Sequence, residues 1–339
     1  MTENILSREG MPGDRSLDQT LRPKQFEDFI GQDRVKENLR IYIQAARQRG
    51  EALDHILLSG PPGLGKTTLA TIIAHEMGAD IKTTSGPVIE KAGDLAGLLT
   101  KLQEGDVLFI DEIHRISPTV EEYLYSAMED YVIDIILDQG PSARSVRIPL
   151  PRFTLVGSTT REGLLAAPFR GRFGVAERLD FYPWQDLFQI AQNSARALGI
   201  QMDDEGAEVI ARRARGTPRL VNRFLRRLRD MAQVLAEGVI TAKVAHDGLD
   251  RLGVDARGLG HMDRRILHAI LRLRGQPVGV KTIAVTVGEE EGTIEDVYEP
   301  YLIQAGYIEK TPRGRVPTEA AFKDYGEGVG GKGEGTLFK

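Results

Sequence analysis

The sequence predicts an α/β protein in which a parallel-sheet domain is followed by an all-helical domain and a C-terminal winged-helix domain. Three observations predict this order. Short apolar runs alternate with amphipathic segments from about residue 20 to Tyr182, residues 184–253 carry only helical patterns, and three helical patterns then precede a basic two-stranded tip. Alternation of strands and helices is typical of a parallel sheet covered by helices.

Length and composition agree with several packed domains. A chain of 339 residues suits two or three domains, and 41% hydrophobic residues are enough for packed cores, which excludes global disorder. Because there is no cysteine, disulfides, thiol nucleophiles and thiolate zinc sites are excluded. The first residues show no signal pattern and no stretch approaches 18 apolar residues, so we expect a cytoplasmic protein without a membrane span.

The net charge of −5 argues against a general basic coat for nucleic acid. Residues 257–325 are neutral overall, with ten Lys or Arg and ten Asp or Glu. Their cations gather at Lys310, Arg313 and Arg315, with only Glu309 beside them in the sequence. We therefore expect weak, local and salt-sensitive DNA contacts from each subunit, and affinity that comes from assembly.

The first domain is expected over residues 1–182. Its predicted strands are His55–Gly60, Ile81–Gly86, Val107–Asp111, Phe153–Thr160 and Glu177–Tyr182. A side feature interrupts this alternation: Val132–Leu137 and Arg144–Leu150 flank Asp138–Ser142, a pattern that predicts a hairpin.

Two further domains are expected over residues 183–253 and 256–339. The second is all-helical, and the third has predicted helices over His261–Leu273, Val280–Val287 and Thr293–Gln304. A basic two-stranded tip follows, with Pro312-Arg313-Gly314 at its turn, and this order is the winged-helix pattern. Residues 326–339 contain six glycines, so we expect a disordered tail.

A phosphate-binding loop is predicted over residues 60–67. Gly60-Pro61-Pro62-Gly63-Leu64-Gly65-Lys66-Thr67 fits G-x-x-x-x-G-K-[ST], follows an apolar strand and opens a helix. Glycines let backbone N–H groups surround phosphates, and the helix N-terminus adds its dipole. We expect Lys66 on the β- and γ-phosphates of ATP and the Thr67 hydroxyl on Mg²⁺.

Two carboxylates follow another buried strand. Val107–Ile110 is apolar, and Asp111 and Glu112 come directly after it, at the end of the strand where open α/β sheets hold ligands. We expect this strand to neighbour the phosphate-loop strand. Asp111 would then hold Mg²⁺ through water, and Glu112 would deprotonate the attacking water, which distinguishes a hydrolase from a P-loop kinase.

Three more residues are candidates for phosphate contacts. Thr160 ends a strand in Ser158-Thr159-Thr160, Arg172 lies in Ala167–Gly174 near the end of the sheet domain, and Arg219 lies in Gly216-Thr217-Pro218-Arg219. From the residues alone, a polar strand end and surface arginines remain alternatives.

These segments, in this order, resemble the AAA+ ATPases, and more closely the RuvB family of Holliday-junction branch-migration motors. The resemblance covers about residues 17–325. It rests on the phosphate loop, Asp111-Glu112-Ile113-His114-Arg115, the winged-helix unit after the lid, and the segments Leu21-Arg22-Pro23, Phe29-Ile30-Gly31-Gln32, Leu53-Asp54-His55, Thr84-Ser85-Gly86-Pro87 and Thr311-Pro312-Arg313-Gly314-Arg315.

The resemblance implies roles for particular residues around ATP. Leu21, Arg22 and Tyr182 would frame the base and ribose. Thr160 would be the first sensor, Arg172 an arginine finger acting on the neighbouring subunit, and Arg219 the second sensor. The phosphates would lie on Gly63, Gly65, Lys66, Thr67 and Thr68, and Glu129-Asp130-Tyr131 matches a family segment near the nucleotide.

The resemblance also implies partners. The hairpin would dock the junction-binding protein RuvA, with Ile148 and Leu150 as exposed apolar anchors, although alternating apolar residues on a hairpin more often pack inward. Lys310 and Arg315 would contact the backbone of duplex DNA, with Arg313 nearby. Glu291 stands where some family members have a cation. A homohexameric ring, a junction resolvase as a further partner, and roles in recombination, DNA repair and the SOS response are implied as well.

Other interpretations stay open. Eight arginines crowd residues 212–229 without an acid among them, which fits a DNA-facing surface or, more readily, a lid contact with the next subunit. The histidines show no metal spacing. The rival functions are a nucleotide-gated, sequence-specific DNA-binding regulator and a clamp-loader-like remodeller.

Overall fold

The structure, a computed structural model, describes residues 5–6, 21–136, 145–273 and 275–326. The chain forms two compact units, one from Asp18 to Tyr182 and the other from Pro183 to Lys339 together with Met1–Leu17. The predicted hairpin loop Asp138–Ser142 and the glycine-rich tail beyond residue 326 lie outside the described residues. No helix in the described part of the chain is both long and apolar enough to cross a membrane.

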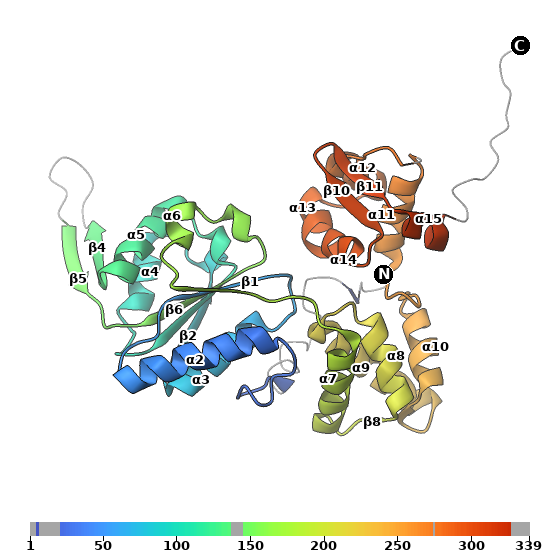
Figure 1. The fold of residues 1–339 in the computed structure, drawn as a ribbon, viewed down its shortest axis with the longest axis horizontal. Helices are drawn as coiled ribbons and strands as arrows, with labels where there is room; N and C mark the ends of the chain where they lie inside the picture. Colours follow the sequence, from blue (N-terminus) through green and yellow to red (C-terminus); the bar gives the residue numbers. More distant parts are fainter. Residues whose placement is uncertain (1–4, 7–20, 137–144, 274, 327–339) are drawn as a thin grey trace, which may run out of the picture. The chain divides into compact units, whose positions relative to one another are not determined.

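The first unit is built on a five-stranded parallel sheet (Figure 1). Its strands are β1 (Ile56–Ser59), β2 (Ile81–Ser85), β3 (Val107–Asp111), β6 (Thr154–Thr159) and β7 (Val175–Arg178). The order is β2-β3-β6-β1-β7, so β6 lies between β1 and β3. The expectation that the Asp111 strand neighbours the phosphate-loop strand was wrong, because the crossover after β3 returns the chain to the middle of the sheet.

The last strand is shifted from its predicted range. The apolar pattern predicted Glu177–Tyr182, but β7 spans Val175–Arg178. Val175 and Glu177 are buried and alternate with exposed neighbours. The chain leaves the sheet after Leu179, and Tyr182 instead hydrogen-bonds to Leu64 in the phosphate loop.

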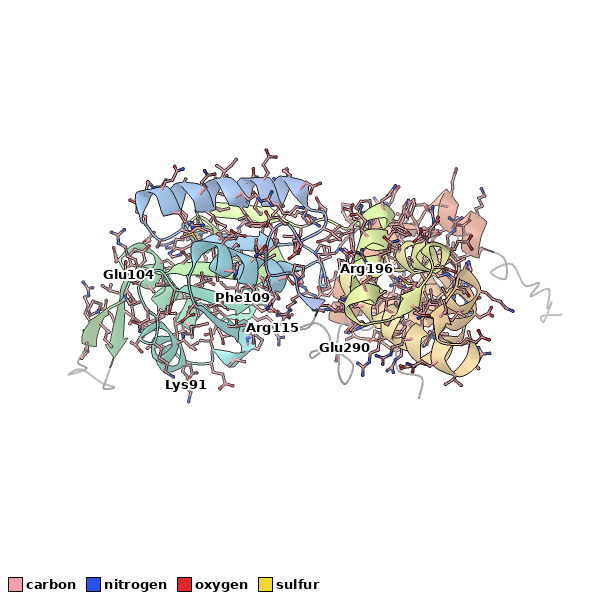
Figure 2. The ribbon with its side chains drawn as sticks, turned by 90° about the horizontal axis from the view of Figure 1, so that it is seen from below. Lys91, Glu104, Phe109, Arg115, Arg196 and Glu290 are labelled. Atoms are coloured by element: carbon pink, nitrogen blue, oxygen red, sulfur yellow. The ribbon has the colours of Figure 1, made fainter. Side chains whose placement is uncertain are left out.

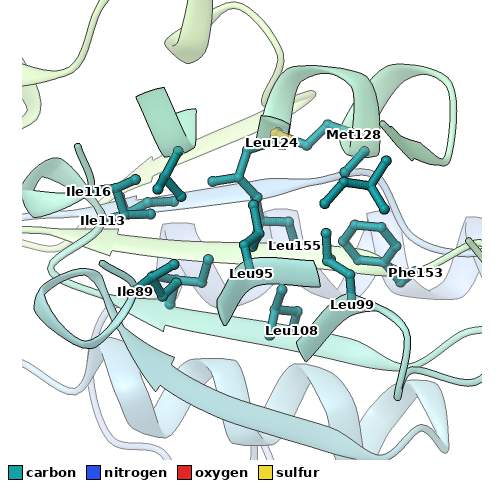
Figure 3. Close-up of a cluster of buried hydrophobic side chains, with 14 of the residues drawn as sticks. Ile89, Leu95, Leu99, Leu108, Ile113, Ile116, Leu124, Met128, Phe153 and Leu155 are labelled. Atoms are coloured by element: carbon teal, nitrogen blue, oxygen red, sulfur yellow. The ribbon is translucent and has the colours of Figure 1, made fainter. Parts of the chain in front are cut away.

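Helices cover both faces of this sheet. Figure 1 shows α2 (Asp33–Arg49) and α3 (Lys66–Met77) on one face, opposite α4 (Ala92–Leu99), α5 (Pro118–Glu129) and α6 (Ala167–Arg170). Figure 3 shows the core between the sheet and the second group, where Leu108 and Leu155 of the strands meet Leu95 of α4 and Leu124 of α5. Because both faces are covered, β1, β3 and β6 are buried over nearly their whole length, and β1 and β3 are mainly apolar.

A hairpin projects beyond α5. Its strands β4 (Val132–Ile136) and β5 (Ser145–Pro149) are antiparallel, and Ile133 lies opposite Ile148. This agrees with the predicted strand pair.

The second unit begins with a helical domain. Its helices are α7 (Trp184–Ala197), α8 (Asp204–Arg213), α9 (Pro218–Leu235) and α10 (Ala242–Arg251). Two short parallel strands, β8 (Gln201–Met202) and β9 (Val239–Ile240), add the only sheet pairing among the described residues of this domain. Helical periodicity could not reveal a two-residue pairing.

The winged-helix domain completes the second unit. It contains α11 (His261–Leu271), α12 (Val280–Val287), α13 (Glu291–Thr293), α14 (Glu299–Gln304), α15 (Glu319–Tyr325) and the antiparallel wing strands β10 (Ile308–Thr311) and β11 (Gly314–Pro317). The helix expected over Thr293–Gln304 contains a π-helical turn, Ile294–Tyr298. Pro300 follows this turn and has no N–H to continue the regular ladder, so the shift in hydrogen bonding is local.

Candidate nucleotide-binding site

The phosphate loop connects β1 to α3 and has the backbone of an anion cradle. Gly60, Gly63 and Gly65 have φ values of 129°, 81° and 99°. A Cβ on Gly60 would lie 2.3 Å from the carbonyl oxygen of Leu179, so only glycine fits there. The loop ends at the N-terminus of α3, whose first N–H groups have no partner within the helix.

Two side chains brace this loop. The buried ammonium of Lys66 donates to the carbonyl oxygens of Gly60 and Pro61, at 2.7 Å each. The buried Tyr182 hydroxyl donates to the Leu64 carbonyl at 3.1 Å. Thr67 and Thr68 lie half-buried in the first turn of α3. The predicted phosphate residues and Tyr182 therefore meet at one place.

The two carboxylates lie at the carboxyl end of β3. Asp111 accepts hydrogen bonds from the Ser158 hydroxyl and, at 3.0 Å, from the N–H of Glu112. Glu112 has a left-handed backbone, with φ of 50°, which turns its side chain away from the line of the strand. Its carboxylate pairs at 3.0 Å with Arg115, which Figure 2 labels.

Thr160 has a buried hydroxyl that can bind a polar ligand. Its hydroxyl is buried and has no hydrogen-bond partner among the described residues, an arrangement that folded proteins rarely keep without a use. It directly follows β6, the strand between the phosphate-loop strand and the Asp111 strand. The sheet order therefore places Thr160 at the end of the strand between the two halves of the site.

Sequence reasoning missed two members of this site. Ser158 binds Asp111, and the Nδ1 atom of His114 lies 2.9 Å from the Thr159 hydroxyl. The run Ser158-Thr159-Thr160 was the available signal. It could not assign these contacts because they join segments about 45 residues apart in the chain.

The site fits a nucleotide with Mg²⁺. Thr67 and Asp111 offer the hard oxygen ligands that Mg²⁺ prefers. Across the described ranges, no three His, Asp or Glu side chains gather into a metal cage. Mg²⁺ usually needs only one or two protein ligands, because phosphate and water supply the others.

Arg172 lies apart from these groups, in the segment after α6. Its guanidinium contacts Glu129 at 3.2 Å, donates to the Pro168 carbonyl at 2.7 Å and lies 4.1 Å from the centre of the Tyr125 ring. The structure thus brings together two predicted site residues, Arg172 and Glu129, on the surface of α5.

Comparison with known proteins matches all three parts of the chain. The family model described as the Holliday junction DNA helicase RuvB P-loop domain matches residues 21–179, the RuvB AAA lid domain matches residues 182–255, and the RuvB C-terminal winged-helix domain matches residues 256–325. The chain belongs to the RuvB family. It is therefore a member of the P-loop AAA+ branch-migration motors.

Solved structures agree with this membership. The Thermotoga maritima RuvB Holliday junction branch migration motor is 49% identical, with a TM-score of 0.82 over 90% of this chain and 98% of that chain. A variant of it with one lysine changed to arginine has a TM-score of 0.83 at 49% identity, over 89% and 97% of the two chains. The RuvB parallel-sheet, lid and winged-helix fold predicted from the sequence is confirmed.

The remaining candidates for nucleotide contacts are spread over the two units. Leu21 and Arg22 are half-buried at the start of the first unit, and Arg219 lies in the first turn of α9 in the second. Tyr131 packs against His55 and Phe153, which precede β1 and β6. It therefore lies at the opposite end of the sheet from the phosphate loop of the same chain. The structure does not bring Tyr131 to that loop.

The hairpin corrects one expectation for the RuvB partner surface. Leu150 is only 8% exposed, and Ile148 is half-buried against the core beside α5. Leu150 is therefore not an exposed anchor, because the base of the hairpin packs on the sheet domain. The backbone N–H of Leu150 donates a hydrogen bond to the Tyr131 carbonyl there. Val146, two residues nearer the tip than Ile148 and on the same face, is 42% exposed.

The wing holds one of its predicted DNA-contact residues in internal ion pairs. Arg315 is only 6% exposed and forms a two-bond ion pair with the buried Glu299, with a further bond to Glu295 at 2.7 Å. Burial acts to raise the pKa of Glu295, but hydrogen bonds from Arg315 and Lys310 outweigh it and hold that pKa below its usual value. Arg315 is thus engaged in internal ion pairs, which the sequence could not show, and its contact with DNA stays a prediction.

The other two wing cations stay accessible. Arg313 is exposed at the turn, while Lys310 is half-exposed and pairs with Glu295 at 3.3 Å. The sequence showed only Glu309 near these cations. Glu295 and Glu299 come from the preceding helical segment and reach the wing through folding.

The arginine-rich stretch of the lid is also partly internal. Arg213, Arg215 and Arg223 are buried. Arg213 pairs with Asp250 at 2.6 Å, and Arg215 pairs with Asp263 of the winged-helix domain. These side chains hold the second unit together, so a DNA-facing surface cannot use all eight arginines.

Proposed function

We propose that this chain is an ATP-driven ring motor that pulls duplex DNA and drives branch migration of Holliday junctions together with RuvA. The buried, unpartnered Thr160 hydroxyl carries this proposal, because it lies between a phosphate cradle and the Asp111-Glu112 pair. Membership of the RuvB family supports it.

The chemistry follows from the positions of the side chains. The loop N–H groups and Lys66 bind the ATP phosphates, with Thr68 beside them, and Leu21, Arg22 and Tyr182 frame the base and ribose. Thr67 and Asp111 would hold Mg²⁺, which would supply positive charge beside the phosphates. Glu112 takes the proton of the attacking water, and Thr160 orients that water or the γ-phosphate.

Glu112 must first leave Arg115. Their ion pair is exposed to solvent on the arginine side, so it is weak and can exchange. Arg172 completes the site of the neighbouring subunit, and Arg219 of the lid reports loss of the γ-phosphate. Hydrolysis then changes the angle between the lid and the sheet domain, and the subunits of the ring hydrolyse ATP in turn. The ring is a hexamer, and the protein is cytoplasmic.

The partner surfaces follow the corrected geometry. Exposed Arg313, with Lys310 beside it, grips DNA phosphates without reading sequence. The hairpin face that carries Val146 and Ile148 docks RuvA. The domains are proposed to span residues 1–182, 183–253 and 256–339.

A four-way-junction assay tests the proposal. The full chain is mixed with RuvA, ATP, Mg²⁺ and a synthetic junction, and we expect junction dissociation and, by electron microscopy, rings around DNA. Glu112→Gln should bind ATP without turnover. Sequence-specific footprints without dissociation would favour the regulator instead.

The hairpin has its own matched pair of variants. Val146→Asp should abolish stimulation by RuvA while DNA-stimulated ATP hydrolysis remains. Val88→Asp, at another exposed apolar position of the first unit, is the control and should change neither.

A further inference from the structure

Arg172 is held from two directions by side chains of one helix. The Cζ atom of Arg172 lies over the Tyr125 ring, 4.1 Å from its centroid. Glu129, one helical turn later on α5, contacts two nitrogen atoms of the same guanidinium at 3.2 and 3.3 Å. The Pro168 carbonyl accepts a third N–H at 2.7 Å. The side chain of Arg172 is therefore ordered before any neighbouring subunit approaches.

The Tyr125 ring is itself fixed. It packs against Phe169 of α6, with ring centroids 5.7 Å apart, and its hydroxyl donates to Glu121 one turn earlier on α5. Burial and the hydrogen bond to Glu121 raise the pKa of Tyr125 to about 12, so the ring stays neutral. A neutral ring held by Phe169 and by its own hydroxyl is a rigid support for a cation.

The ring and the carboxylate use different parts of the guanidinium. The Tyr125 ring lies against the central carbon of the guanidinium, whereas hydrogen bonds to an anion leave from its N–H groups. Glu129 is 56% exposed, so its ion pair is weakened by water and a more highly charged anion can replace it. Exchange of the anion leaves the contact with Tyr125 in place.

We propose that Tyr125 is a positioning residue: it is the platform that holds Arg172 at the angle needed to reach the γ-phosphate bound by the neighbouring subunit, where the phosphate takes the N–H edge that Glu129 occupies here. This inference rests on the proposed function. The platform removes conformational freedom from the arginine before the transition state forms.

DNA-stimulated ATP hydrolysis by the full chain tests the platform. Tyr125→Leu should lower kcat on the order of tenfold while KM for ATP changes little, because the chain's own pocket is intact. Tyr125→Phe keeps the ring and should restore most of the turnover. Tyr42→Leu, at an exposed tyrosine on α2, is the matched control and should retain wild-type kinetics.

Mixed rings separate positioning from a general loss of structure. Tyr125→Leu subunits have intact pockets, so Lys66→Ala subunits, which keep their arginine, should rescue turnover at shared interfaces. Tyr125→Leu should also add no further loss to Arg172→Ala. Wild-type kcat in Tyr125→Leu, or a loss that adds to Arg172→Ala and is not rescued, would overturn the platform.

The same experiments distinguish a failure of the proposed function from a failure of the Tyr125 platform. An inactive wild-type chain would refute the ATPase. An active wild-type chain with a fully active Arg172→Ala variant would leave the ATPase standing but remove the finger, and the platform with it.

Discussion

The guanidinium of Arg315 on the wing forms a buried ion pair with the carboxylate of Glu299 on α14. Arg315 also exchanges backbone hydrogen bonds with Val278, which ties the wing to the segment before α12. A cation in the basic tip is thus committed to the domain interior.

Arg315→Ala should therefore destabilise the winged-helix domain. Removing the arginine leaves the buried Glu299 carboxylate to the more distant, partly exposed Lys310 ammonium at 3.7 Å, which costs at most about 3–5 kcal/mol. Denaturant unfolding of the full chain measures this. Arg313→Ala, at the exposed turn, should change stability by less than about 0.5 kcal/mol but weaken binding to duplex DNA and reduce the salt slope by about one. The reverse pattern would support Arg315 as the DNA contact.

Arg215→Ala should weaken the joint between the lid and the winged-helix domain. Arg215 pairs with Asp263, which is fully buried, and also donates to the Gly258 carbonyl. An unpaired Asp263 costs about 3–5 kcal/mol, so calorimetry should show an earlier transition. Arg229→Ala, which breaks only an exposed pair with Asp230, should cost at most about 1 kcal/mol. Equal stability of the two variants would contradict the structural role of Arg215.

Thr160→Val should separate stability from turnover. The Thr160 hydroxyl makes no hydrogen bond within the described structure, so its loss costs no stability, whereas ATP turnover should fall by about 10- to 100-fold with nucleotide binding kept. Thr154→Val, at the other end of β6, is the control. It leaves the Leu53 carbonyl unpaired, so it should lose about 1–3 kcal/mol of stability and keep its turnover.

His55 should make the fold sensitive to mild acid. Its Nδ1 accepts the Leu155 N–H at 2.9 Å, and its Nε2 lies 3.1 Å from the Met128 carbonyl, so the ring is held neutral. Burial lowers the pKa of His55 below 6.5 in the folded chain. The unfolded chain therefore takes up a proton first, and this stabilisation is present above pH 6.5 and lost as pH falls toward the folded pKa.

Urea unfolding between about pH 7 and pH 5 measures this dependence. His55→Gln should flatten it, whereas His75→Gln, at an exposed histidine of α3, should leave the wild-type slope. An unchanged slope in His55→Gln would assign the acid sensitivity to other groups.

The phosphate loop, the Asp111-Glu112 pair and the succession of sheet, lid and winged-helix domains could all be predicted from the amino-acid sequence. These features are local, since glycine spacing, hydrophobic period and turn residues act over a few positions. The tertiary structure alone decided that β6 separates β1 from β3 and brings Ser158 to Asp111 across 47 positions. Strand order depends on how crossovers pack, which no local pattern records.

The same limit applies to Leu150 and Arg315. Sequence alternation placed Ile148 and Leu150 on one hairpin face but could not show that burial increases toward the hairpin base, where Leu150 meets the core. The basic tip displayed Arg315 but not Glu299, which folding brings against it from 16 positions away. Whether a charge faces DNA or an internal partner depends on where its counter-charge lies in space, and only the folded chain decides that.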